Sequence, residues 1–292
     1  MSGPIHVVLA FDDNFWAPAY ATMRGICLSS RRRGEITFHA LQIGLSSAHK
    51  ADIDRIREEF GADIHYVDLL ADAAFNRMAA RLPARRGGKR EICYARLMID
   101  RLLPPEVDRF VYADCDMLFK APVEDLADLD LGGKAIAAVT DVYGLRMTGK
   151  RDLRQNRDLF DTSDPYFNAG LLVADRAAWR RAEPLVVLDR LIETDRLRRL
   201  YHDQDVLNLV FKDNWLILDS LWNYLDPTPS AQSLNPRVLH YTGKLKPWRP
   251  RMPVAFARLY RRVMTRPVYD QYRRERRARY WAGIGRRLMA WR

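Results

Sequence analysis

The chain has 292 residues, 48% of them hydrophobic, and a formal net charge of +11. This length and composition allow one large core, as one domain or a domain with an appendage, and exclude a mostly disordered chain. Three scattered cysteines exclude a disulfide framework and predict a reducing compartment. No window approaches the about 18 apolar residues of a membrane span, and "IHVVLAF" near the N-terminus is too short for a signal peptide. We therefore expect a cytoplasmic protein.

Short β-branched runs alternate along the chain with amphipathic runs. The predicted strands cover residues 6–11, 35–43, 64–69, 109–116, 135–141, 168–175 and 237–243, and the predicted helices cover 49–61, 91–105 and 203–212. Several strand runs are apolar on both faces, as in strands covered by helices on each side. The alternation predicts an α/β fold of Rossmann-like type with a mostly parallel sheet. The polar segment 144–165 is typical of a mobile loop near the active edge of such a sheet.

The positive charge lies at the end of the chain. Residues 244–292 contain 14 Arg and 2 Lys against one Asp and one Glu, so this segment carries a charge of +14 and the remainder −3. From residue 256 onward, arginine is interleaved with Tyr, Trp, Leu and Met. Anionic lipid attracts basic residues, and aromatic rings favour the membrane interface. We therefore predict a catalytic domain at 1–249 and a helical tail at 250–292 that docks on an anionic membrane. Nucleic acid, which similar patches also bind, is not the expected partner.

Two aspartates follow the apolar run "FVYA" at 110–113. Asp114 and Asp116 are two residues apart, so in extended geometry their side chains point to the same face. Close carboxylates repel each other and are costly to bury without a partner, which predicts a positive group beside them. Ligands of an open α/β sheet bind beyond the carboxyl ends of its strands. The pair thus predicts a divalent cation site, while Asp-x-Asp alone also fits a turn or cap.

Phosphatases of the haloacid dehalogenase type also place Asp-x-Asp after an apolar strand, with the first Asp as nucleophile. In those enzymes a Thr or Val usually follows one residue later. Here Met117 and Leu118 follow, and no Lys or Asp-Asp partner motif is evident downstream. The sequence therefore argues against this class.

Six segments follow one another in a fixed order. They are "AFDDNF" (10–15), "YARLMID" (94–100), "DCD" (114–116), "YFNAGLLVAD" (166–175), "YHDQDVLN" (201–208) and "LHYTGKLKPW" (239–248). Together they resemble glycosyltransferase family 8, close to the bacterial lipopolysaccharide galactosyl- and glucosyltransferases and more distantly glycogenin. The resemblance covers residues 5–249. It implies a retaining transferase that uses a UDP-sugar and Mn²⁺ on a single α/β domain of the GT-A type.

The resemblance also implies roles for individual residues. The implied metal ligands are Asp114, Asp116 and His240. Two carboxylates and an imidazole suit Mn²⁺ better than Mg²⁺, which stays the alternative. The implied contacts to uridine are Ala10, Asp12 and Asn14, and those to the diphosphate are Arg96, Gly243 and Lys246, with Arg96 also reaching the sugar. The implied sugar contacts are Asp141, Asn168, Asp203 and Gln204, with Asp114 beside them. Of these, Gln204, Asp203 and Asp141 are the implied catalytic residues.

Gln204 corresponds in the family to the residue nearest the β-face of the anomeric carbon. Because an amide is a poor nucleophile, we expect front-side displacement within an oxocarbenium-like ion pair. The leaving phosphate would help to deprotonate the acceptor, and Gln204 would stabilise positive charge at the anomeric centre.

Simpler roles stay open for several of these residues. Asp12, Asp13 and Asp203 are also placed to cap helices, Asn168 could be a turn residue, and His240 a hydrogen-bonded core histidine.

Two features depart from the family pattern. Glu91, Ile92 and Cys93 stand where relatives often have small hydroxyl residues, which affects how the donor is bound there. Cys115 separates the two acids, and we expect its side chain to face away from the metal.

The leading hypothesis is transfer of a hexose from UDP-galactose or UDP-glucose to a saccharide, such as lipopolysaccharide or another lipid-linked glycan. The enzyme would attach peripherally to the inner face of the membrane. One alternative is a glycogenin-like protein that glucosylates its own tail at Tyr260, Tyr269, Tyr272 or Tyr280. Another is a non-catalytic protein that binds membranes or nucleic acid, against which the complete motif set argues.

Overall fold

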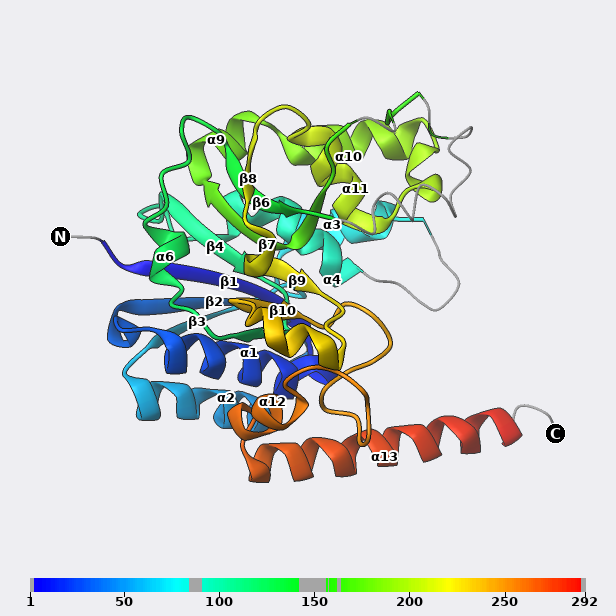
Figure 1. Ribbon diagram of the computed structural model, residues 1–292. Coiled ribbons are helices and arrows are strands. Elements are labelled where there is room, and N and C mark those ends of the chain that lie inside the picture. Colours follow the sequence, from blue (N-terminus) through cyan, green and yellow to red (C-terminus); the bar gives the residue numbers. More distant parts are fainter. Residues whose placement is uncertain (1–2, 84–90, 142–155, 157, 162–163, 290–292) are drawn as a thin grey trace.

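The structure is a computed structural model that describes residues 3–83, 91–141, 156, 158–161 and 164–289. A mixed sheet of seven strands forms its centre, in the order β3-β2-β1-β4-β7-β6-β8 (Figure 1). Its strands are β1 (Ile5–Asp12), β2 (Ile36–Ile43), β3 (Asp63–Asp68), β4 (Arg109–Ala113), β6 (Ile136–Thr140), β7 (Phe167–Asp175) and β8 (Trp215–Leu218). Only β7 runs antiparallel to its neighbours in this sheet. The predicted α/β fold with a mostly parallel sheet is therefore confirmed.

A second, small sheet joins distant parts of the chain. It contains β5 (Met117–Phe119), β10 (Val238–His240) and β9 (Tyr224–Leu225), in the order β5-β10-β9. β10 is antiparallel to β5, and His240 pairs with Met117. This register places His240 beside the residue that follows Asp116. The sequence pattern predicts β10, within the run 237–243, but neither β5 nor β9.

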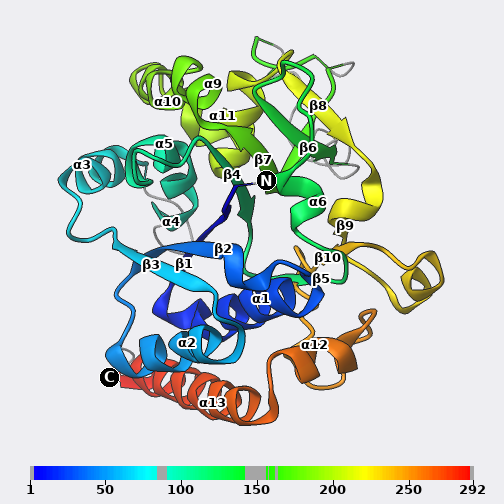
Figure 2. The same ribbon diagram turned by 90° about the vertical axis from the view of Figure 1, so that its left-hand side faces the viewer.

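Helices cover both faces of the central sheet (Figures 1 and 2). One layer contains α1 (Trp16–Ser29), α2 (Ser47–Phe60), α12 (Ala257–Val263) and α13 (Arg266–Met289). The other contains α3 (Ala73–Arg81), α4 (Glu91–Tyr94), α5 (Ile99–Leu102), α9 (Arg176–Arg181), α10 (Pro184–Glu193) and α11 (His202–Val210). A short helix, α6 (Glu124–Ala127), follows β5.

The two layers explain why the strands are apolar on both faces. Along β1, Val7 and Leu9 pack into the core shared with α1, α2 and α12. Val8, between them, packs into the core on the opposite face, together with residues of α3 and α11. Alternate side chains of one strand thus enter two different cores.

Short 3₁₀ turns complete the fold. They are η1 (Asp13–Phe15), η2 (Arg33–Glu35), η3 (Ala95–Met98), η4 (Arg196–Arg199), η5 (Ser220–Asn223) and η6 (Pro229–Leu234). The helix predicted over 91–105 is in fact α4, η3 and α5, so Arg96 lies in a 3₁₀ turn. The predicted loop at 144–165 lies largely outside the described residues.

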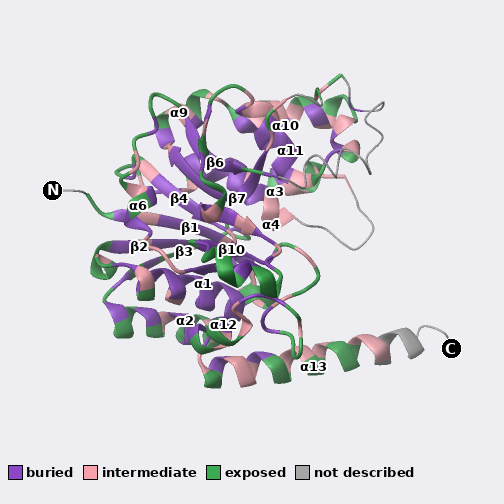
Figure 3. Ribbon diagram, viewed as in Figure 1, coloured by how far each residue is buried: buried purple, intermediate pink, exposed green. Residues whose placement is uncertain are grey.

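The basic C-terminal segment begins as part of the fold. Val263, Met264, Val268 and Tyr272 are buried in the same core as α1. Between Arg273 and Ile284 no residue of α13 is buried (Figure 3). The Trp281 side chain is 63% exposed. In the described part of the chain, no helix has the length and apolar character needed to cross a lipid bilayer. The predicted tail therefore has a packed first part and an exposed second part.

Candidate active site

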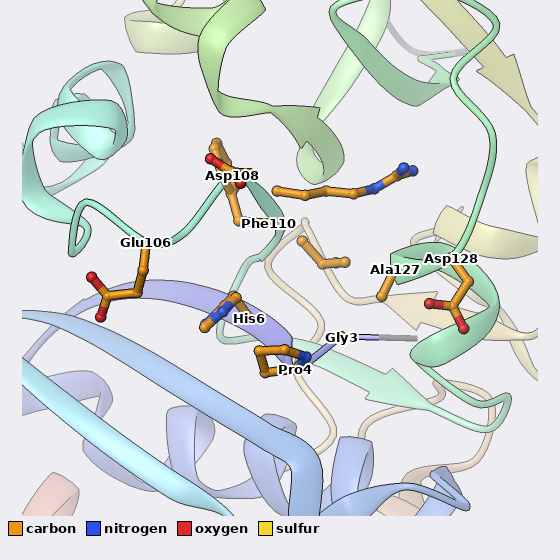
Figure 4. A pocket seen from close by; sticks show the side chains of 10 residues that line it. Gly3, Pro4, His6, Glu106, Asp108, Phe110, Ala127 and Asp128 are labelled. Carbon is orange, nitrogen blue, oxygen red and sulfur yellow. The ribbon is translucent and has the colours of Figure 1, made fainter. Parts of the chain in front are cut away.

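A cleft of about 350 Å³ opens at the carboxyl ends of β4 and β6, beside the small sheet. The cleft is lined by nine of the predicted site residues: Arg96, Asp114, Asp116, Asp141, Asn168, Asp203, Gln204, His240 and Gly243. Four others, Ala10, Asp12, Asn14 and Lys246, are not among its lining residues. A second hollow of about 250 Å³ lies at the opposite, amino ends of β1 and β4, near His6, Glu106 and Asp108 (Figure 4). None of the predicted site residues lines that second hollow.

Arg96 is the positive group beside Asp114, the first of the two paired aspartates. Its guanidinium lies 2.9 Å from Asp114 Oδ1 and, through Nε, 2.7 Å from Asp203 Oδ2. The same guanidinium donates to the Ala169 carbonyl at 2.5 Å and lies 4.4 Å above the Tyr112 ring. One buried cation thus faces two carboxylates, which offsets the cost of burying them.

Asp116 has a basic group beside each of its oxygens. Its Oδ1 lies 3.1 Å from His240 Nε2, and its Oδ2 lies 2.7 Å from Lys246 Nζ. Burial alone would raise the pKa of the Asp116 carboxyl, but His240 and Lys246 hold it well below its usual range. Asp116 is therefore ionised.

The hydrogen-bond pattern around His240 fixes which ring nitrogen carries a proton. The Gly170 amide donates to Asn168 Oδ1 at 3.0 Å, which identifies that atom as the oxygen. Asn223 Nδ2 donates to the same oxygen at 2.9 Å, so Asn223 Oδ1 faces His240 Nδ1, 2.9 Å away. Nδ1 therefore carries a proton, and Nε2 is the ring nitrogen that faces the acids, with its lone pair directed at them whenever the ring is neutral.

Asp114, Asp116 and His240 are suited to hold a cation. Each offers one ligand atom, and these atoms lie within 4.8 Å of one another. Without a cation, the Nε2 lone pair of a neutral imidazole would face two carboxylates. The donor set fits a divalent metal that accepts both oxygen and imidazole ligands, such as Mn²⁺.

Gly170 leaves the space that this cluster needs. A Cβ atom at this position would lie 2.2 Å from His240 Cε1 and 2.8 Å from Asp114 Oδ2. Any side chain there would displace the imidazole or the carboxylate. Glycine is therefore required by close approach.

A network of amides and carboxylates lines the other end of the cleft. Gln204 Nε2 donates to Asp141 Oδ2 at 3.0 Å and to the Tyr166 hydroxyl at 3.2 Å, while its Oε1 accepts from the Ala169 amide at 3.1 Å. Asn168 Nδ2 donates to the same Asp141 oxygen at 3.1 Å. Both ends of the Gln204 side chain are thus held by neighbours.

Asp203 is an acid whose pKa is raised by burial. Burial raises its pKa to about 6, and Arg96 opposes this shift. Asp203 lies within α11 and does not cap it, because that helix begins after Tyr201. The alternative role as a helix cap is therefore wrong for Asp203.

The residues at the end of β1 form a separate turn. Asp12 caps η1, accepting hydrogen bonds from the amides of Asn14 and Phe15 at 3.0 and 3.2 Å. This is the simpler role considered for Asp12. Ala10 accepts a hydrogen bond from the Cys115 thiol at 3.6 Å, so that side chain is directed toward β1. The turn ends the strand next to β4, at the same edge of the sheet as the two acids.

Several residues of the site were missed by the sequence analysis. Asn223 and Gly170 position His240, as described above. Asp226 lines the cleft and accepts from the Gly243 amide at 2.6 Å. Asp205 accepts from the Tyr166 hydroxyl at 2.5 Å. Of these, only Gly170 and Asp205 lay inside a recognised motif, which could have drawn attention to them.

The central sheet, the small second sheet and the acid-lined cleft define a glycosyltransferase fold of the GT-A class. The galactosyltransferase LgtC, solved with donor and acceptor sugar analogues, superimposes with a TM-score of 0.73 at 24% identity, covering 89% of this chain and 95% of that one. The bifunctional glycosyltransferase WbbM superimposes with a TM-score of 0.76 at 20% identity, over 94% of this chain and 52% of that one.

Residues 6–251 match the model of glycosyl transferase family 8, and the chain belongs to that family. Its relatives include general stress protein A of Bacillus subtilis (strain 168), 24% identical over 84% of this chain and 87% of that protein. Another is the lipopolysaccharide 1,2-glucosyltransferase of Escherichia coli (strain K12), 30% identical over 53% of this chain and 48% of that enzyme. The chain thus matches less than half the length of the second relative. The predicted family is confirmed.

Proposed function

We propose that this glycosyltransferase is retaining and metal-dependent, and that it transfers galactose or glucose from a UDP-sugar to a saccharide acceptor. The observation that carries this proposal is the convergence of Asp114, Asp116 and His240 in one cleft, with Arg96 and Lys246 beside them. Such a set fits a cation together with a diphosphate, because it combines metal ligands with groups that bind anions.

In this proposal Asp114, Asp116 and His240 hold Mn²⁺, with Mg²⁺ as the alternative. When bound, the metal would neutralise the negative charge of the leaving UDP as a Lewis acid. Lys246 would bind the diphosphate as a point charge, since its ammonium group already lies at the edge of the acid cluster. The Gly243 backbone and Arg96 would contact the donor from the cleft wall.

The amide network would receive the sugar. Asp141 and Asn168 offer polar groups to its hydroxyls, and Asp203 fixes Arg96 through their ion pair. Gln204 is a poor nucleophile, because it is an amide and its oxygen already accepts from the Ala169 amide. We therefore assign Gln204 the stabilisation of positive charge at the anomeric carbon during front-side displacement.

Ala10, Asp12 and Asn14 would hold the uridine. They lie at the end of β1, next to the strand that carries Asp114. This position suits a donor that extends along the edge of the sheet, from the nucleoside at β1 to the sugar at α11.

The acceptor is proposed to be lipid-linked, at the cytoplasmic face of an anionic membrane. The part of α13 after Tyr272 supports this, because Arg273, Arg274, Arg277 and Trp281 are exposed on it. Exposed arginines attract anionic headgroups, and tryptophan favours the interface. The named substrate of the Escherichia coli relative, lipopolysaccharide, is an acceptor of this kind.

A transfer assay tests this function. The protein is incubated with Mn²⁺, a lipooligosaccharide and either UDP-galactose or UDP-glucose, and the products are examined by mass spectrometry and NMR. We expect one hexose to be added to the acceptor with an α-linkage, as in the donor. A β-linked product would contradict retention, and transfer from neither donor would contradict the proposed substrates.

The same assay distinguishes transfer to an acceptor from self-glucosylation, which the exposure of one tail tyrosine still allows. Of the tail tyrosines, Tyr260 and Tyr272 are buried, whereas Tyr280 is 65% exposed. An increase in the intact mass of the protein that is lost in Tyr280→Phe would identify that reaction.

A further inference from the structure

A chain of polar contacts joins the C-terminal helix α13 to the turn at the end of β1. His49, on α2, places Nδ1 2.6 Å from Asp13 Oδ1 and Nε2 3.1 Å from Glu275 Oε1. The other Glu275 oxygen accepts from Trp16 Nε1 at 3.0 Å, and Gln271 Nε2 donates to Oε1 at 3.2 Å. Three elements that are distant in sequence thus meet at one imidazole.

These contacts are partly shielded from water. The Trp16 ring stacks on His49, with ring centroids 4.5 Å apart and planes 12° from parallel. Partial burial alone would raise the pKa of the Glu275 carboxyl, but hydrogen bonds from Trp16, His49 and Gln271 hold it below its ordinary value. Glu275 is therefore a charged anchor between α13 and the body of the protein.

Tyr272 makes a second, direct contact with the same turn. Its hydroxyl donates to the Asn14 carbonyl at 3.1 Å, and its ring lies edge-on to Trp16. Tyr272 is only 3% exposed, whereas Asn14 and Phe15 of the turn are exposed. The turn is one short 3₁₀ segment, which is weak by itself and relies on such supports.

We propose that Tyr272 and Glu275 are positioning residues for the donor, because they hold the Asp12–Asn14 turn in the shape that receives the nucleoside. This inference rests on the proposed function, in which the turn binds uridine. α13 then contributes to donor affinity without touching the donor. The helix that carries the exposed arginines after Tyr272 also supports the nucleotide site.

The test compares Tyr272→Phe with Tyr280→Phe, a matched change at an exposed position of the same helix. Hydrogen–deuterium exchange is measured on the segment 11–16, in which the Asn14 and Phe15 amides are bonded to Asp12. The dissociation constant of UDP is measured by calorimetry with Mn²⁺ present. We expect Tyr272→Phe to speed the exchange and raise the dissociation constant by about five- to tenfold, the effect of one lost hydrogen bond. Tyr280→Phe should match the wild type in both.

Glu275→Gln is the second variant, and the donor KM and kcat are measured for Glu275→Gln and for Tyr272→Phe. We expect the donor KM to rise in each, with kcat unchanged at saturating donor, since neither residue touches the reacting atoms. Unchanged exchange in both variants overturns the link between α13 and the turn. Faster exchange with an unchanged UDP affinity overturns the role in donor binding. A wild-type protein that binds no UDP overturns that role and the proposed function together, and the exchange data still decide whether α13 supports the turn.

Discussion

His240 Nδ1 lies 2.9 Å from the side-chain oxygen of Asn223, and this contact directs the other ring nitrogen toward Asp114 and Asp116. Asn223 is itself oriented by Asn168, which is oriented by a backbone amide. A series of amides that begins at the backbone of β7 thus determines the direction of the imidazole lone pair.

Asn223→Ala removes this constraint. We expect the affinity for Mn²⁺ to fall about 10- to 100-fold, as is usual when the partner of a ligating histidine is lost. Titration of Mn²⁺ followed by electron paramagnetic resonance measures this directly. Asn76→Ala is the control, because that exposed side chain donates only to the Leu70 carbonyl among its described contacts. An unchanged Mn²⁺ affinity in Asn223→Ala would show that Asn223 does not orient the ligand.

Gly170→Ala inserts a methyl group into the cluster. The new Cβ would meet His240 Cε1 at 2.2 Å, so the imidazole must leave its place. We expect Mn²⁺ binding to weaken by at least about tenfold, because a ligand is displaced. Gly34→Ala is the matched control, since the nearest atom to its Cβ is 4.0 Å away. Normal Mn²⁺ binding by Gly170→Ala would mean that His240 is not a ligand.

The raised pKa of Asp203 gives a pH dependence with a definite sign. Its folded-state pKa of about 6 lies above the ordinary value of 3.8, so the folded protein holds an extra proton between these values. The free energy of unfolding therefore falls as the pH rises through this window, by at most about 3 kcal/mol from this group.

Urea unfolding at pH 4 and pH 7 checks this in Asp203→Asn, which cannot ionise. We expect the stability of the wild type, relative to the variant, to decline between the two pH values. Asp195→Asn, at an aspartate whose side chain is 76% exposed, should show no such difference from the wild type. Parallel curves for the wild type and Asp203→Asn would contradict the raised pKa.

The strands and the acid pair could be predicted because their signals are local. Helices cover both faces of the sheet, so its strands are apolar runs that can be recognised in the sequence. Asp114 and Asp116 come at the end of one such strand. Asn223 could not be predicted, because it directly precedes β9, a strand that is defined by its pairing with β10, more than ten residues later. The requirement for glycine at position 170 comes from a histidine 70 residues away.

The packing of the first part of the tail against the core could not be predicted, because the segment is rich in charged residues. Val268 and Tyr272 are spaced one turn apart among many arginines, so the composition suggested a surface segment throughout. The structure shows that these two side chains enter the core. Removal of residues 250–292 would therefore expose that core, and membrane binding must be tested by substitutions in the part of α13 after Tyr272.

The membrane test uses a triple variant in which Arg273, Arg274 and Arg277 are all changed to Gln. Each basic residue near an anionic surface contributes about 1 kcal/mol, so we expect binding to vesicles rich in anionic lipid to weaken about 100-fold. The control changes Arg101, Arg181 and Arg190 to Gln, which removes the same charge from exposed positions on the opposite helical layer. Equal losses in the two variants, measured by vesicle sedimentation, would show that overall charge and not α13 governs binding.

The proposed function requires the cleft to bind a UDP-hexose through a cation held by Asp114, Asp116 and His240. The most direct measurement is UDP release from UDP-galactose and UDP-glucose, first with Mn²⁺, then with a chelator, then with Mn²⁺ restored. We expect slow release from one of the two donors that stops with the chelator, returns with the metal and is absent in Asp116→Asn. UDP release that persists in the chelator, or is undiminished in Asp116→Asn, would contradict donor binding through a cation at these residues.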